Sequence, residues 1–184
     1  PERGRAARGA QAIADRDECR ECRAVTLDAD DRRTPTSGMP LRDLDVAKTT
    51  RILNTIIEYE LAGVVRYTHY ALMVAGPNRI PIVAFLTAQA QESLLHAQQA
   101  GEVLTGLEGH PSMRIAPLEE TNQHSIQALL QESLNHELEA VKHYKALLEA
   151  VENASIYLEE FARTMIGAEE RHQLELKKML RDFS

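Results

Sequence analysis

The chain has 184 residues and a formal net charge of −7. This acidic balance argues against nucleic acid as a partner, because phosphate binding depends on lysine and arginine displacing counterions. No apolar run reaches the roughly 18–20 residues of a membrane span and no signal-peptide core follows the arginine-rich start, so we expect a cytoplasmic protein with no membrane partner.

The first 44 residues differ in composition from the rest of the chain. Arginine and acidic residues crowd this segment without a sustained helical stripe, which predicts a flexible N-terminal extension. Its two cysteines, Cys19 and Cys22, form a single C-x-x-C. A rubredoxin-type metal site needs two such pairs, so we interpret them as reduced thiols. Residues 45–184 form the predicted folded domain.

From Asp45 onward, apolar residues recur at helical spacing. Pro81 suits the first turn of a second helix. Asn122 is a suitable N-cap for a third helix, and either Asn153 or Ser155 for a fourth. The four predicted helices cover about 46–75, 81–107, 122–151 and 155–181.

The lengths of the connections predict the topology. The first and last connections have about five residues each, so each joins two antiparallel helices. The middle connection of about fourteen residues reaches ~46 Å at ~3.3 Å per residue. The second helix is roughly 40 Å long at 1.5 Å per residue. We therefore predict an all-α four-helix bundle with one long crossover between helices 2 and 3.

Two similar stretches place glutamates on the apolar stripes of the first and third helices. Glu60 opens ELAGVVRY and Glu137 opens ELEAVKHY, and both fit E-L-x-x-V-x-x-Y. A carboxylate is costly to bury among apolar residues without a compensating charge. The repeated pattern therefore indicates that both glutamates have the same functional role inside the bundle.

The second and fourth helices add four more polar residues to these stripes. Glu92 and His96 lie on the second helix, and Glu169 and His172 on the fourth; each glutamate follows that of its hairpin by 32 residues. Four buried carboxylates would repel one another, whereas two divalent cations would neutralise them. Oxygen-rich ligation with one imidazole per ion favours iron or manganese over zinc. The six residues thus predict a dinuclear site of the carboxylate bundle type.

Three segments resemble the ferritin-like superfamily and, within it, bacterioferritin. They are LNTIIEYELAGVVRY ending at Tyr67, HELEAVK starting at His136, and EERH ending at His172. The resemblance implies two iron ions per chain, with manganese as an alternative. It also implies that Glu60 and Glu137 are terminal ligands and Glu169 a bridging ligand. Tyr67 and Tyr144 would be hydrogen-bond donors that orient the terminal glutamates.

The chain departs from that family at three points. Ser93 stands where the second helix of the family has a ligand glutamate, and we predict that Glu92, four residues before His96, replaces it. Leu94 stands at the position of the haem-binding methionine, so we predict no haem. Only twelve residues follow His172, which leaves little room for the fifth helix of the family's cages. We therefore predict a homodimer, with a larger cage as the alternative.

These features predict a ferroxidase that oxidises Fe(II) with O2 or H2O2 for iron detoxification or storage. A peroxide scavenger of the rubrerythrin or manganese-catalase kind is an alternative on the same ligands. A non-catalytic bundle with a structural metal or protonated carboxylates is another. Surface or packing roles are expected for the other five histidines: His69, His110, His124, His136 and His143.

Overall fold

A computed structural model describes residues 43–181. Within that range it contains no strand and four helices, α1 (Val46–Met73), α2 (Arg79–Gly106), α3 (Ile126–Val151) and α4 (Ile156–Leu180). The predicted all-α bundle is confirmed. Residues 1–42 of the predicted extension, with Cys19 and Cys22, lie outside the described residues. No described helix combines the length and apolar character needed to cross a bilayer.

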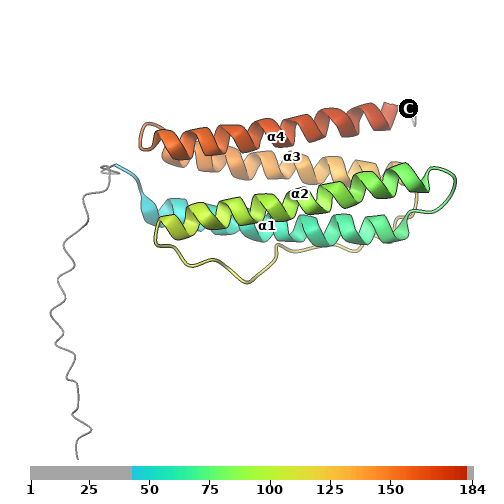
Figure 1. Ribbon diagram of the computed structural model, residues 1–184, viewed down its shortest axis with the longest axis horizontal. Helices are drawn as coiled ribbons and strands as arrows, with labels where there is room; N and C mark the ends of the chain where they lie inside the picture. The colour runs from blue at the N-terminus through green and yellow to red at the C-terminus, as the bar shows by residue number, and fades with distance from the viewer. Residues whose placement is uncertain (1–42, 182–184) are drawn as a thin grey trace, which may run out of the picture. The chain divides into compact units, whose positions relative to one another are not determined.

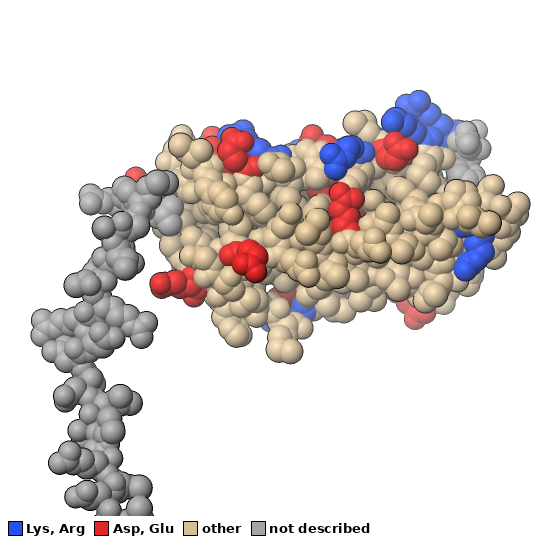
Figure 2. Space-filling model, in the orientation of Figure 1, with Lys and Arg blue, Asp and Glu red and all other residues tan. Residues whose placement is uncertain are grey.

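The helices form two antiparallel hairpins joined by the predicted crossover. Helix α1 packs along α2, α3 packs along α4, and α1 also contacts α3 (Figure 1). The chain between α2 and α3 runs the length of the bundle beside α1, so that α3 starts at the same end as α2 (Figure 1). On the face shown in Figure 2, acidic and basic side chains are interspersed among uncharged residues.

Side chains at the helix starts fix where three of the helices begin. Asp45 accepts a hydrogen bond from the backbone N–H of Lys48 at 2.8 Å, and Ser155 caps α4 in the same way. The third helix begins later than predicted, because Ser125 rather than Asn122 is its cap. Asn122 has a φ of 55°, which lies in the left-handed region and does not lead into a right-handed helix.

The crossover is attached to α1 by polar contacts around Asn54. Its side chain donates to the carbonyl of His110 at 3.1 Å and accepts from the backbone of Ser112 at 2.7 Å. One turn further on, the carboxylate of Glu58 binds the guanidinium of Arg114. The two Asn54 hydrogen bonds satisfy backbone groups of a segment that has no secondary structure of its own.

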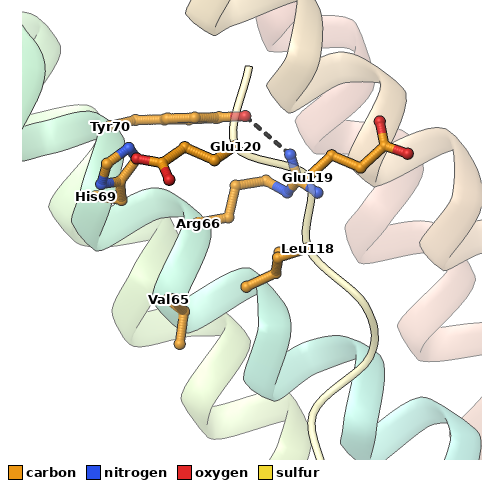
Figure 3. A pocket seen from close by; sticks show the side chains of 7 residues that line it. All are labelled: Val65, Arg66, His69, Tyr70, Leu118, Glu119 and Glu120. Atoms are coloured by element: carbon orange, nitrogen blue, oxygen red, sulfur yellow. Dashed lines mark hydrogen bonds between the residues drawn. The ribbon is translucent and has the colours of Figure 1, made fainter. Parts of the chain in front are cut away.

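A surface cavity of about 350 Å³ lies between α1 and the later part of the crossover (Figure 3). Arg66, one of its polar lining residues, donates to the hydroxyl of Tyr70 at 2.8 Å and lies 5.9 Å from that ring's centre. None of the predicted metal ligands lines this cavity.

Apolar layers enclose the middle of the bundle on both sides. One layer contains Leu53, Ile56 and Leu104, and another contains Val74 and Leu86. The predicted ligands lie along each helix between such layers. A polar site at this depth is shielded from solvent and held by well-packed helices.

Gly63 marks the closest approach of three helices beside the predicted ligands. A Cβ atom added there would lie 2.7 Å from Nε2 of His136 on α3 and 2.8 Å from Oγ of Ser93 on α2. We expect Gly63→Ala to lower the free energy of unfolding by about 1–3 kcal/mol, because either neighbour must move. Denaturant unfolding measures this change.

Gly101 provides the matched control for Gly63. It also lies inside a helix, but an added Cβ would meet nothing within 4 Å. Gly101→Ala should therefore raise stability by up to about 1 kcal/mol, through helix propensity alone. Equal effects of the two substitutions would contradict the close packing at Gly63.

Candidate metal centre

Five of the six predicted ligands point into the bundle. Their exposed fractions are 3% for Glu60, 6% for His96, 3% for Glu137, 2% for Glu169 and 8% for His172. Each helix contributes at least one of them. The helical spacing that placed these residues on apolar stripes therefore corresponds to burial on α1, α3 and α4, and on α2 at His96 only.

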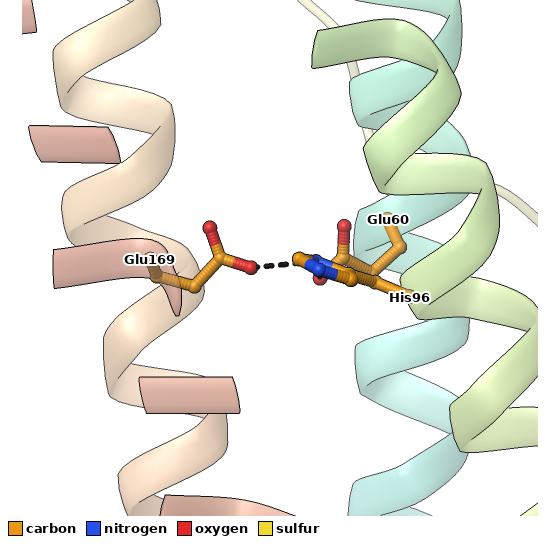
Figure 4. Close-up of side chains that lie close together, drawn as sticks. All are labelled: Glu60, His96 and Glu169. Carbon is orange, nitrogen blue, oxygen red and sulfur yellow. Dashed lines mark ion pairs between the residues drawn. The ribbon is translucent and has the colours of Figure 1, made fainter. Parts of the chain in front are cut away.

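Glu60, His96 and Glu169 form the first of two ligand groups (Figure 4). They come from α1, α2 and α4, and one potential ligand atom from each lies within 4.8 Å of the others. Nδ1 of His96 is 2.8 Å from Oε1 of Glu169 and 3.6 Å from Oε1 of Glu60. Two carboxylates and one imidazole thus converge from three directions.

Glu137, Glu169 and His172 form the second group, from α3 and α4. Nδ1 of His172 lies 3.4 Å from Oε2 of Glu137 and 3.2 Å from Oε2 of Glu169. Glu169 therefore belongs to both groups, with one carboxylate oxygen facing each. The rings of His96 and His172 are nearly parallel, with centres 6.3 Å apart, which agrees with two similar half-sites.

The donor atoms of each group are close enough together to hold a metal ion. Oε1 of Glu169 is buried without a hydrogen bond, although Nδ1 of His96 lies only 2.8 Å away. A buried carboxylate oxygen that lacks a hydrogen bond normally requires an explanation. A cation between these two atoms would use both lone pairs, and the oxygen-rich donor set suits iron or manganese.

Burial and negative charge act in opposite directions on the two imidazoles. Burial works to lower the pKa of His96, but Glu169 and Glu60 outweigh it and raise the pKa to about 10. Burial likewise works to lower the pKa of His172, whereas Glu137 and Glu169 raise it to about 10. In the metal-free protein, protonated imidazoles thus occupy the place of cations, and metal binding must displace their protons.

The carboxyl groups respond differently to the same surroundings. Burial raises the pKa of Glu137, with a further contribution from nearby Glu169. Burial also works to raise the pKa of Glu169, but His172 and His96 on either side hold it below the usual value. The shared carboxylate is thus the one best suited to remain charged.

The two predicted tyrosines bind the terminal glutamates in a crossed arrangement. Tyr144 on α3 donates a hydrogen bond of 2.8 Å to Oε1 of Glu60 on α1. Tyr67 on α1 donates to Oε1 of Glu137 on α3. Each tyrosine therefore serves the glutamate of the other hairpin. Burial raises the pKa of both hydroxyls well above the ordinary value, so they remain neutral donors.

Glu92 is the one predicted ligand that lies outside both groups. Its side chain is 32% exposed, and Oε1 lies 3.1 Å from Nε2 of His172, on the side of the ring away from Glu137 and Glu169. Ser93, which is 7% exposed, takes the inward position on α2. The inward position on α2 thus belongs to Ser93, one residue after Glu92, which the sequence predicted there.

His136 is a buried polar residue next to the site. Its ring stacks on Tyr59 at 4.4 Å and meets Tyr67 edge-on at 5.6 Å. Nδ1 has no hydrogen bond, and burial lowers the pKa to about 4, so the imidazole is neutral at pH 7. These contacts agree with the predicted packing role of His136. The helical spacing of the sequence did not show that its ring lies close to Gly63 on α1.

Several solved structures have the same fold. A structure of ferritin-like, diiron-carboxylate proteins from Bacillus anthracis is 24% identical, with a TM-score of 0.70 over 74% of this chain and 97% of that chain. A bacterioferritin-related dodecameric thioferritin from Bacteroides fragilis is 22% identical, with a TM-score of 0.72 over 78% and 90%. Desulfovibrio desulfuricans bacterioferritin is 20% identical, with a TM-score of 0.65 over 74% and 80%.

Comparison of the sequence with protein-family models identifies the family of this chain. No curated protein sequence matches significantly. The family model of the ferritin-like domain, however, matches residues 50–184, which include α2, α3, α4, most of α1 and every ligand candidate. The chain therefore belongs to the ferritin-like domain family.

Proposed function

We propose that this protein oxidises Fe(II), with O2 or H2O2 as the electron acceptor, in iron detoxification or storage. The observation that carries the proposal is the pair of buried ligand groups joined by Glu169. Two Fe(II) ions held side by side can deliver two electrons together. With two protons, these electrons reduce O2 to H2O2, or H2O2 to two water molecules.

The residues of the chain have separate tasks in this reaction. Glu60 and Glu137 each bind one substrate ion, and Glu169 holds both. These carboxylates favour the ferric state, because anionic ligands stabilise the higher charge. Tyr67 and Tyr144 keep the terminal carboxylates oriented. The apolar layers on either side limit the access of water.

The same ligand set is compatible with manganese, and a manganese-loaded site would favour disproportionation of peroxide. Iron is our proposal because related folds include a diiron-carboxylate protein and a bacterioferritin. The absence of haem at Leu94 stays a prediction. The homodimer also stays a prediction, and the dodecameric thioferritin of similar fold supports the alternative of a larger cage.

An anaerobic titration of metal-free protein with Fe(II), followed by addition of oxygen, tests this function. We expect two Fe(II) ions per chain and rapid growth of the near-ultraviolet ferric absorption. Iron that binds without oxidation by O2 or H2O2 would contradict the ferroxidase. Loss of helical stability on metal removal, without any turnover, would favour a structural metal instead.

A further inference from the structure

Glu92 holds the outer nitrogen of one ligand histidine. Its Oε1 lies 3.1 Å from Nε2 of His172 and 3.7 Å from the guanidinium of Arg171. Nδ1 of the same ring faces Glu137 and Glu169. A carboxylate at the outer nitrogen keeps a proton there, which leaves the inner lone pair free for a metal and makes the ligand more basic.

Within the part of the chain that the structure describes, no carboxylate lies within ion-pair distance of the outer nitrogen of His96. Among residues 43–181, the carboxylates within ion-pair distance of His96 are Glu60 and Glu169, and both lie at Nδ1, the inner nitrogen. Three carboxylates therefore approach His172, and two approach His96. The half-sites that the sequence presents as copies differ in this respect.

The number of buried carboxylates also makes the attraction for the first metal ion different from the attraction for the second. Ser93 occupies the inward position of α2, so the two groups contain three carboxylates: Glu60, Glu137 and Glu169. The three carboxylates carry a charge of −3 before the first divalent ion binds, and one bound divalent ion reduces the sum of these charges to −1; each imidazole gives up its proton when its ion binds. The attraction for the second ion is accordingly weaker in this enclosed environment.

We propose that Glu92 holds His172 in position for metal binding, so that the position at His172 binds its ion more tightly than the position at His96 does. Glu92 is then a positioning residue and not a ligand. The inference rests on the proposed function, since it assigns different affinities to the two positions that hold the substrate ions.

Anaerobic titration with Co(II), followed by calorimetry and visible absorption, tests the inequality. We expect two steps of one ion per chain, with dissociation constants at least about tenfold apart. His96→Ala should remove the weaker step and keep the tighter one, whereas His172→Ala should remove the tighter one. A single step of two equal ions would overturn the proposal, as would loss of the tighter step in His96→Ala.

Substitutions of Glu92 test its positioning role. Glu92→Leu should weaken the tighter step by about 10–100-fold, the usual cost of losing a partner of a ligand histidine. Glu92→Gln keeps an oxygen acceptor and should have a smaller effect. Glu102→Gln, an exposed position on the same helix, should change neither step. An unchanged tighter step in Glu92→Leu would refute the role of Glu92.

Failure of this inference is distinguishable from failure of the proposed function. Two unequal Co(II) steps in a protein that does not oxidise Fe(II) would retain the inequality and remove the ferroxidase. One step of two equal ions in a protein that oxidises Fe(II) rapidly would retain the ferroxidase and remove the inequality.

Discussion

Glu169→Gln is expected to remove both metal positions at once. Each oxygen of this carboxylate faces a different ligand group. The substitution removes one of three buried negative charges and turns an NH2 donor toward one of the groups. We expect fewer than one bound ion per chain and a fall in Fe(II) oxidation of at least about 100-fold, since loss of a supporting residue alone costs 10–100-fold.

The neighbouring residue provides a control for this substitution. Glu170 is also on α4, but its side chain is exposed and lies 3.9 Å from Lys145 at the surface. Glu170→Gln should leave metal binding and oxidation unchanged. Circular dichroism should show intact helices in both variants. If Glu169→Gln kept one ion with native affinity, Glu169 would not be shared between the two positions.

The metal-free protein is expected to lose stability as the pH rises from about 6.5 to 10. The pKa values of His96 and His172 are raised to about 10 in the folded chain, whereas an unfolded histidine titrates near 6.5. A raised pKa gives stability that is complete below the unfolded value and is lost as the pH rises through the folded value. Both groups act in this direction, because each imidazole gains its carboxylate partners only in the folded chain.

Denaturant unfolding across this pH range measures the loss. Comparison with a His96→Gln, His172→Gln double variant separates it from the titration of lysines and tyrosines. The metal-loaded protein should not show the loss, because cations replace the imidazole protons and proton release accompanies their binding. Metal-free stability that stayed constant or increased between pH 7 and 10 would show that the imidazoles are not held in the charged form.

The sequence was sufficient for the bundle, its crossover and the burial of five ligand candidates. These features follow from local patterns: helical spacing of apolar residues on α1, α3 and α4, and the lengths of connections. The structure confirms that fold. Glu60 and Glu137 could be located because each is a charged residue on an otherwise apolar stripe.

Helix α2 was harder to interpret because its apolar residues lie on several faces. Ile80, Leu94 and Leu95 are exposed, and Ala88 is exposed as well. Without one dominant stripe, the choice between Glu92 and Ser93 as the inward residue depends on a rotation of about 100°, which a local pattern does not determine.

Long-range contacts set the features that the sequence did not reveal. The exchange of tyrosines between hairpins joins residues 70 and 84 positions apart. The burial of His136 depends on Tyr59 and on the space at Gly63, both on another helix. No periodicity within one helix contains this information.

The two tyrosine–glutamate hydrogen bonds relate the hairpins of this single chain as the two subunits of a symmetric dimer are related. In an isologous contact, residue i of one copy meets residue j of the other, and j meets i in return. Tyr67 with Glu137 and Tyr144 with Glu60 follow this rule between α1 and α3. Each hairpin alone would leave a buried carboxylate without its donor. Each hairpin therefore depends on the other for a hydrogen-bond donor. A substitution of Tyr67 or Tyr144 in one hairpin would affect the glutamate of the other.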